Sequence, residues 1–190
     1  MPIHDINAAG TAVKIAKVED VTASGAANEI SEVHDVNVSG TASLVYKKQL
    51  VLYDRGVINP AAGDFVGSSD FSKQSDHLLY QRNTGSGSTT RYWLTTNAFD
   101  VTPYKGLYIE YTSSGGGTTG SYGPGLFSGT ASTPSTSNKI VNTTFTTTTV
   151  MTLASIDISS LSGLAKFGGL IATTSSSATY YHRMYKIWLE

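Results

Sequence analysis

The residues of this 190-residue chain that could best support binding chemistry are aromatic and guanidinium side chains beside polar loops. Sugars bind to such groups because their C–H faces stack on aromatic rings while their hydroxyls need polar partners. Arg91 and Trp93 share one face of an expected strand, since side chains alternate along a strand. We expect four residues to form a glycan-binding site: Tyr80, Arg91, Trp93 and Tyr122. The alternative is that the rings belong to a hydrophobic core or to an interface between copies of the chain.

Groupings typical of catalysis are missing from the sequence. The chain has no Cys and no Gly-x-Ser-x-Gly motif, and the Gly115-Gly116-Gly117 run lacks the Lys of a phosphate-binding loop. The acidic residues of the segment 64–76 do not have the spacing of a calcium loop. Paired carboxylates for glycoside cleavage stay an open alternative, because their separation in space cannot be read here. We expect no enzymatic activity and no cofactor.

His4 and His34, each followed by Asp, invite a metal-site interpretation. Around a three-fold axis, three copies of one such residue could ligate an ion. The equivalent residue between them is Glu19, so the ligand pattern is not consistent. We favour a solvated polar face, because exposed polar residues are ordinary, and we expect no metal.

The composition favours β structure with uncharged polar surfaces. Charged residues make up 14% of the chain, against a usual share of about a quarter. The net charge of −1 would attract neither nucleic acid nor an anionic membrane, so neither is expected as a partner. No basic segment followed by an apolar one begins the chain, and no run of about 18 apolar residues occurs. We therefore expect synthesis in a cytoplasm, without a standard secretion signal or a membrane span.

Residues 3–48 contain one short pattern written three times. Equivalent residues recur every 15 positions: Asp5, Asp20 and Asp35, and likewise Gly10, Gly25 and Gly40. Val, Thr, Asn and Asp are mediocre helix formers, so a helical coil is disfavoured. Gly accepts the positive φ of a tight turn, and we expect an extended segment, a turn and a second extended segment in each repeat.

Each repeat has few apolar residues to bury, so one copy should be unstable alone. Small or apolar residues recur at every third position, and association of three chains about an axis would bury them. We expect eight residues in this trimer interface: Ile6, Ile15, Val18, Val21, Ile30, Val33, Val36 and Val45.

The 15-residue period with its turn glycine resembles the triple β-spiral shaft of viral fibres, as in adenovirus fibre and reovirus attachment proteins. It is also similar to short repeats in structural proteins of phages of Gram-positive bacteria. The resemblance covers about a quarter of the chain and implies a fibre stalk over residues 1–48. An antiparallel meander with Ser-Gly hairpins remains the alternative topology.

Residues 49–190 predict about eight strands with regular turns and no helix, which favours an antiparallel β-sandwich of jelly-roll type. The clearest strands are expected at 50–56, 76–81, 90–96, 107–111, 143–153, 168–173 and 179–189. Residues 113–138 are expected to form a long loop. In the last strand, alternation places Tyr181, Arg183 and Ile187 on one face and His182 and Trp188 on the other. Apolar residues on both faces predict a central strand covered on both sides.

This second region resembles modules of phage tail and minor structural proteins, which in turn are similar to galactose-binding-like sandwiches. The segments that carry the resemblance are Leu52-Tyr53-Asp54, residues 99–111, Ile156-Asp157-Ile158-Ser159 and the ending Tyr185-Lys186-Ile187-Trp188-Leu189-Glu190.

Together the two resemblances imply a trimeric phage virion fibre whose knob displays a surface for host glycans. A tail-associated position is expected, with a head fibre or capsid decoration protein as the alternative. A further alternative is a carbohydrate-binding module of a bacterial protein. The implied partners are other copies of the chain, virion proteins contacted through the N-terminal region, and a host cell-surface glycan.

Overall fold

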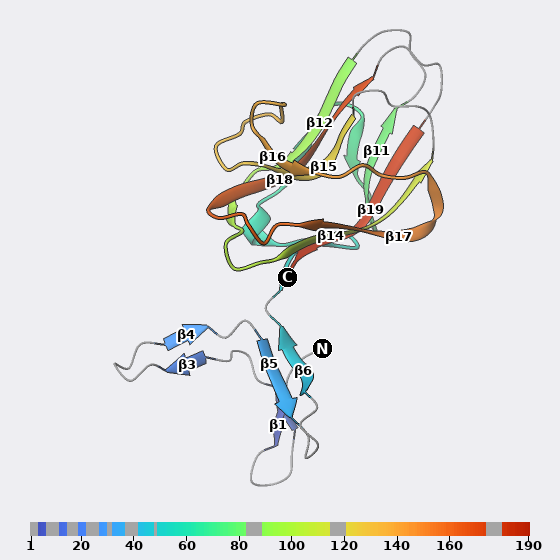
Figure 1. The fold of residues 1–190 in the computed structure, drawn as a ribbon. Helices are drawn as coiled ribbons and strands as arrows, with labels where there is room; N and C mark the ends of the chain where they lie inside the picture. Colours follow the sequence, from blue (N-terminus) through green and yellow to red (C-terminus); the bar gives the residue numbers. More distant parts are fainter. Residues whose placement is uncertain are drawn as a thin grey trace. The chain divides into compact units, whose positions relative to one another are not determined.

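The computed structural model describes residues 49–82, 89–114, 121–173 and 180–190, together with the backbone of six strands between residues 4 and 47 (Figure 1). The chain divides into two compact units, Met1–Gln49 and Leu50–Glu190, one residue away from the boundary expected after residue 48. The described residues contain strands and one short 3-10 helix, η1 (Pro60–Ala62), but no α-helix. The predicted all-β class is therefore confirmed.

The repeat unit contains three separate two-stranded antiparallel sheets. Their strands are β1 (His4–Ile6), β2 (Ala12–Lys14), β3 (Glu19–Val21), β4 (Ala27–Glu29), β5 (Glu32–Val36) and β6 (Ala42–Lys47). The pairs Ile6↔Ala12, Val21↔Ala27 and Val36↔Ala42 show that the register repeats with the sequence. Each repeat therefore pairs its own two arms, as a hairpin does.

The side chains of the expected trimer interface lie outside the described residues. Ile6, Val21, Val33, Val36 and Val45 have only their strand backbone described. Ile15, Val18 and Ile30 lie outside the described strands altogether. Their burial between copies stays a prediction.

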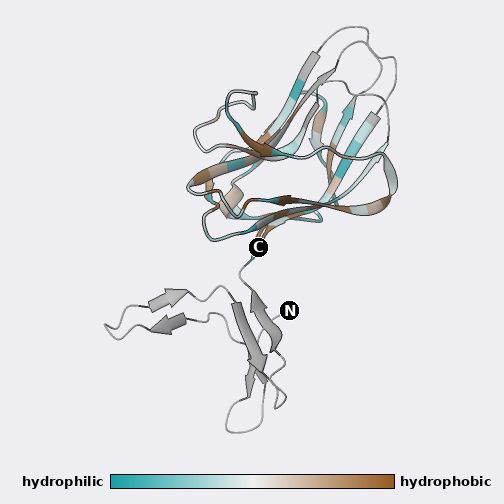
Figure 2. Ribbon diagram, viewed as in Figure 1, coloured by the Kyte–Doolittle hydropathy of each residue, from teal (hydrophilic) through white to brown (hydrophobic). Residues whose placement is uncertain are grey.

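The C-terminal unit consists of two antiparallel sheets. The seven-stranded sheet contains β7 (Leu50–Asp54), β8 (Val57–Ile58), β10 (Phe71–Lys73), β11 (Leu78–Arg82), β14 (Gly106–Ser114), β17 (Thr148–Asp157) and β19 (Tyr180–Leu189). The six-stranded sheet contains β9 (Phe65–Gly67), β12 (Thr89–Thr95), β13 (Phe99–Asp100), β15 (Ser121–Ser128), β16 (Lys139–Asn142) and β18 (Leu164–Thr173). Hydrophobic and hydrophilic residues both occur along these strands (Figure 2), as expected for sheets with one buried face.

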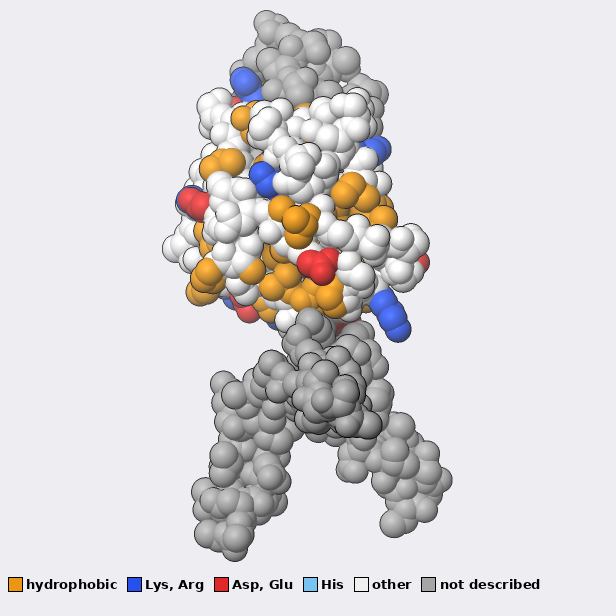
Figure 3. Space-filling view, turned by 90° about the vertical axis from the view of Figure 1, so that its left-hand side faces the viewer, with side chains coloured by type: hydrophobic (Ala, Val, Ile, Leu, Met, Phe, Trp, Pro, Cys, Tyr) orange, Lys and Arg blue, Asp and Glu red, His pale blue; other side chains and the backbone are white. Residues whose placement is uncertain are grey.

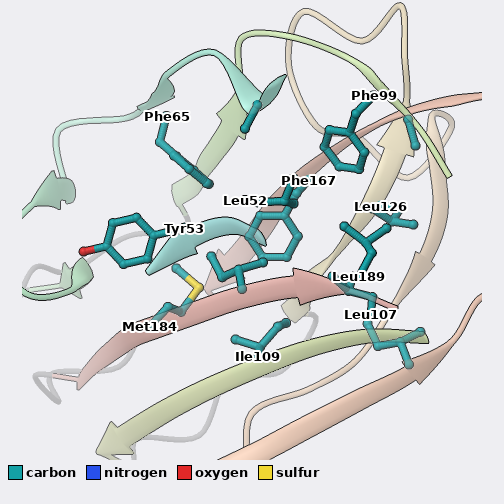
Figure 4. Close-up of a cluster of buried hydrophobic side chains, with 14 of the residues drawn as sticks. Leu52, Tyr53, Phe65, Phe99, Leu107, Ile109, Leu126, Phe167, Met184 and Leu189 are labelled. Atoms are coloured by element: carbon teal, nitrogen blue, oxygen red, sulfur yellow. The ribbon is translucent and has the colours of Figure 1, made fainter. Parts of the chain in front are cut away.

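The two sheets share one hydrophobic core, to which both contribute fully buried side chains (Figure 4). Phe65 and Phe167 come from the six-stranded sheet, and their rings meet edge to face with centroids 6.3 Å apart. Leu107 and Met184 come from the seven-stranded sheet and are completely buried. Each Å² of apolar surface that is removed from water stabilises the folded state by about 25 cal/mol. The shared core is therefore the main stabilising contribution to the fold.

The expectation of a loop over residues 113–138 was wrong in part, because β15 lies inside it. The glycines of β15 allow close packing of its backbone against the neighbouring segment. A Cβ on Gly123 would collide with the carbonyl oxygen of Thr143. Pro124 has no N–H to give to a ladder, and it lies at an irregularity of the pairing with β18, where its carbonyl accepts a hydrogen bond from the Thr143 N–H at 3.0 Å.

Candidate functional surfaces

Two of the four residues expected to bind a glycan lie in the core instead. The side chains of Tyr80 and Trp93 are both 0% exposed, and their ring centroids are 5.5 Å apart. Phe71 stacks on Trp93 with centroids 6.2 Å apart. No ring face of either residue is open to a sugar, so the core interpretation of these two aromatics replaces the binding one.

The other two expected glycan-binding residues are not brought together with them. Arg91 is partly exposed, and its Nε donates to Oδ2 of Asp70 at 2.9 Å. Tyr122 lies on β15, which is separated from β12 by β18, and its side chain is outside the described residues. The four residues therefore do not form one described site.

A β-bulge changes which side chains of β19 face the core. The pairing with β14 passes from Met184↔Tyr111 to Lys186↔Glu110, so two residues of β19 are matched by one of β14. Tyr185 is the extra residue, and the alternation of side chains reverses at it. β19 lies inside its sheet, with β14 on one side and β11 and β7 on the other, which confirms the predicted central position. The expected cover on both faces was wrong, because outer-face residues such as Arg183 are partly exposed.

The bulge corrects the expected assignment of faces. Met184 and Ile187 are both completely buried, although uniform alternation would place them on opposite faces. Tyr181 and Arg183, which were expected to share a face with Ile187, lie on the outer face of the sheet and are partly exposed. Trp188 also lies on the outer face. The sequence carried no clear signal for this reversal, because the extra residue is an ordinary strand-forming tyrosine.

The first outer surface, which we call the Tyr181 surface, consists of Gln81, Ser114, Tyr181 and Arg183. The guanidinium of Arg183 lies over the Tyr181 ring, 4.2 Å from its centroid. Gln81 and Ser114 are the direct cross-strand neighbours of Tyr181 on β11 and β14. An aromatic ring, a guanidinium, an amide and a hydroxyl thus meet on one face, which is the donor and acceptor set that a carbohydrate requires.

The second outer surface, the Trp188 surface, consists of Val51, Tyr108, Met151, Leu153 and Trp188. Tyr108 and Trp188 are cross-strand neighbours whose rings stack with centroids 5.3 Å apart and planes 17° apart. Val51 pairs with Trp188 from the other side. Leu153 is 54% exposed and lies opposite Glu110 on the edge strand β17. Ser155 lies opposite Tyr108 on β17, so the surface is mainly apolar with a polar residue between its rings and Leu153, and it is partly open to solvent.

Four charged side chains lie beside the Trp188 surface and compensate one another. Arg55 donates to Asp54 at 3.0 Å and to Glu110 at 2.9 Å. Hydrogen bonding to Asp54 and the nearby charge of Glu110 raise the pKa of Arg55. The ammonium of Lys186 lies 5.0 Å from the Trp188 ring centroid and 3.9 Å from Asp54. Two cations and two carboxylates give this part of the sheet no net charge.

One buried contact has the residue types of a nucleophile and its base. Ser113 Oγ lies 2.8 Å from Nδ1 of His182, a spacing that nucleophilic catalysis would use. Ser113 is only 2% exposed, and His182 lies against the rings of Tyr80 and Phe145. Burial lowers the pKa of His182 to about 4, which keeps the imidazole neutral at pH 7. Ser113 is buried and His182 is partly exposed, so the contact is a mostly buried hydrogen bond within the sheet.

Over the part of the chain that is described, no group of three or more His, Cys, Asp or Glu side chains could hold a metal ion. No helix in the same residues is long and apolar enough to cross a membrane. In the space-filling view, uncharged polar and hydrophobic side chains cover most of the visible face of the C-terminal unit (Figure 3). Charged side chains are therefore sparse on this face of the C-terminal unit.

Comparison with known proteins adds no relative to these observations. No protein-family model matches the chain, and no curated protein matches it significantly. The function of the chain therefore has to be inferred from the repeated hairpins, the two sheets and the two outer surfaces.

Proposed function

We propose that this chain is a non-enzymatic structural protein of a phage virion, built as a trimeric fibre. In this proposal residues 1–48 form a stalk of the triple β-spiral kind, and residues 49–190 form a jelly-roll-like knob for attachment to a host-surface glycan. A tail-associated position is the first choice. A head fibre or capsid decoration protein is the alternative.

The observation that carries the proposal is the identical register of three successive hairpins, each only a few residues long. The pairs Ile6↔Ala12, Val21↔Ala27 and Val36↔Ala42 repeat one geometry. A lone two-stranded hairpin is at best marginally stable in water, and three separate ones do not form a common sheet. Association with equivalent hairpins of other copies would provide the missing burial, as in repeat architectures generally.

The Tyr181 surface supports the attachment role. Tyr181 offers a partly exposed ring, and Arg183, Gln81 and Ser114 supply hydrogen-bonding groups around it. It replaces the expected site at Tyr80 and Trp93, whose rings are buried. The surface lies at the end of β19 remote from Leu50, where the repeat unit joins.

Sedimentation equilibrium of the full chain tests the assembly, and a mass of three chains is the expected result. A variant with Val21→Asp and Val36→Asp should dissociate, because it places charges in the expected interface. A wild-type chain that sediments as a monomer would contradict the fibre. Binding to host cells and to a glycan array tests attachment. Binding to empty capsids, with no binding to cells or glycans, would favour the decoration alternative.

A further inference from the structure

Arg183 differs from the other two arginine side chains that the structure describes, because it has no acidic partner among the described residues. Arg55 pairs with two carboxylates, at 3.0 and 2.9 Å, and Arg91 pairs with Asp70 at 2.9 Å. The guanidinium of Arg183 is partly exposed and makes no ion pair with a described residue. Its charge is therefore available to an anion that comes from outside this part of the chain.

The strands around Arg183 present no carboxylate that would repel such an anion. Its cross-strand neighbours are Leu79 on β11 and Thr112 on β14, which are both uncharged. The strands β11 and β19 contain no acidic residue. The one acidic residue of β14 is Glu110, and Arg55 already binds it at 2.9 Å. The local charge at Arg183 is therefore positive, although the whole chain has a net charge of −1.

The contact between Arg183 and Tyr181 prepares the guanidinium for a planar anion. The guanidinium lies over the tyrosine ring, 4.2 Å from its centroid. In such a stack the guanidinium uses its flat face, and its N–H groups point outward within its own plane. Those N–H groups form a fork that matches two oxygens of a carboxylate or a phosphate. The ring also restricts the arginine before binding, so less conformational entropy is lost when an anion arrives.

We propose that the Tyr181 surface binds an acidic glycan, and that Arg183 pairs with the carboxylate or phosphate of that glycan. This inference rests on the proposed attachment role and names the class of glycan. Gln81 and Ser114, the cross-strand neighbours of Tyr181, would bind hydroxyls of the sugar that carries the charge. A neutral sugar would leave the charge of Arg183 without a partner.

Binding of the full chain to isolated cell walls of the host tests this assignment. Three preparations are compared: untreated walls, walls whose carboxylates have been converted to amides, and walls whose phosphodiesters have been hydrolysed with hydrofluoric acid. On untreated walls Arg183→Gln should bind about tenfold more weakly than the wild type, because it lacks the charged contact. Arg183→Lys should bind with intermediate affinity, because it keeps the charge but not the planar fork.

Lys139→Gln is the matched control, because it removes a cation from the six-stranded sheet. It should bind untreated walls like the wild type. Loss of binding in this control equal to that of Arg183→Gln would overturn the assignment, because the effect would then follow from net charge alone.

The treated walls show whether Arg183 pairs with the anion. Removal of the right anion should weaken the wild type to the level of Arg183→Gln and leave that variant unchanged, as expected for two coupled groups. Loss after amidation identifies a carboxylate, and loss after hydrofluoric acid identifies a phosphate. A ratio of wild-type to variant affinity that stays at about tenfold on both treated walls would overturn the acidic class and leave attachment intact. A wild-type chain that does not bind untreated walls would overturn the attachment proposal and, with it, this one.

Discussion

The indole ring of Trp93 lies directly on the backbone of Gly169, its cross-strand neighbour on β18. A Cβ built on Gly169 would collide with atoms Cζ2, Cη2 and Cε2 of the indole. The tryptophan fills the space that the glycine leaves open, and both residues are buried. A bulky ring that packs on a glycine of the next strand helps to fix the register of the pair.

We predict that Gly169→Ala destabilises the C-terminal unit by about 1–3 kcal/mol, because overpacking in a filled core forces side chains and backbone to shift. The free energy of unfolding from urea titration measures the effect. Gly163→Asn is the control. Gly163 has a φ of 86°, and no atom lies within 4 Å of the position that a Cβ would take there. Asn adopts positive φ more readily than other residues with a side chain, so we expect a smaller loss than that of Gly169→Ala. Equal losses in the two variants would contradict the packing explanation.

We predict that the C-terminal unit loses stability as the pH falls from about 6.5 towards 4. Burial lowers the pKa of His182 from 6.5 to about 4, so the unfolded chain takes up a proton at a pH where the folded one does not. The free energy of unfolding keeps its full value with respect to this histidine above pH 6.5. As the pH falls towards 4 it declines by about 3 kcal/mol at most, because one pKa unit corresponds to about 1.4 kcal/mol.

His182→Asn removes this titration. Free energies of unfolding of wild type and variant between pH 7 and 4.5 check the prediction, since the carboxylates common to both cancel in the difference. We expect the free energy of unfolding of the wild type minus that of the variant to become smaller as the pH falls. Parallel pH profiles would show that the pKa of His182 is the same in the folded and the unfolded state.

We predict that Arg55→Asn leaves the melting temperature unchanged or raises it. Arg55 has a φ of 40° and precedes Gly56 in the two-residue turn between β7 and β8. Asn-Gly is the preferred pair for such a turn. The ion pairs that Arg55 makes are exposed, and exposed pairs contribute little.

Arg55→Ala loses the same ion pairs without improving the turn, so it should melt below Arg55→Asn. Differential scanning calorimetry of both variants measures the order. If Arg55→Asn melts well below the wild type, the contacts with Asp54 and Glu110 matter more than the turn geometry.

We predict that Tyr181→Ala and Arg183→Ala each weaken binding to host cells by about tenfold, which corresponds to the loss of one stacking or charged contact. Cell-binding assays at several protein concentrations measure the change. Lys139→Ala removes a cation from the six-stranded sheet and should bind like the wild type. Unchanged binding by both outer-face variants would place attachment elsewhere on the chain.

Local sequence patterns predicted the repeat and most of the strands. The 15-residue period predicted the repeat, and the three hairpins show the same register at Ile6, Val21 and Val36. Runs of β-branched and aromatic residues between turn residues predicted the all-β class and most of the long strands. These features follow from the preferences of neighbouring residues, which a sequence displays directly.

The tertiary structure decided which side chains are buried. Tyr80 and Tyr181 are both tyrosines in strands, and only the pairing of β11, β19 and β14 places one in the core and the other on the outer face. The bulge at Tyr185 arises from the match of Met184 and Lys186 to consecutive residues of a strand more than 70 positions away. A shift of one residue in the register between two distant strands moves the side chains to the opposite face of the sheet. No local sequence pattern encodes that register.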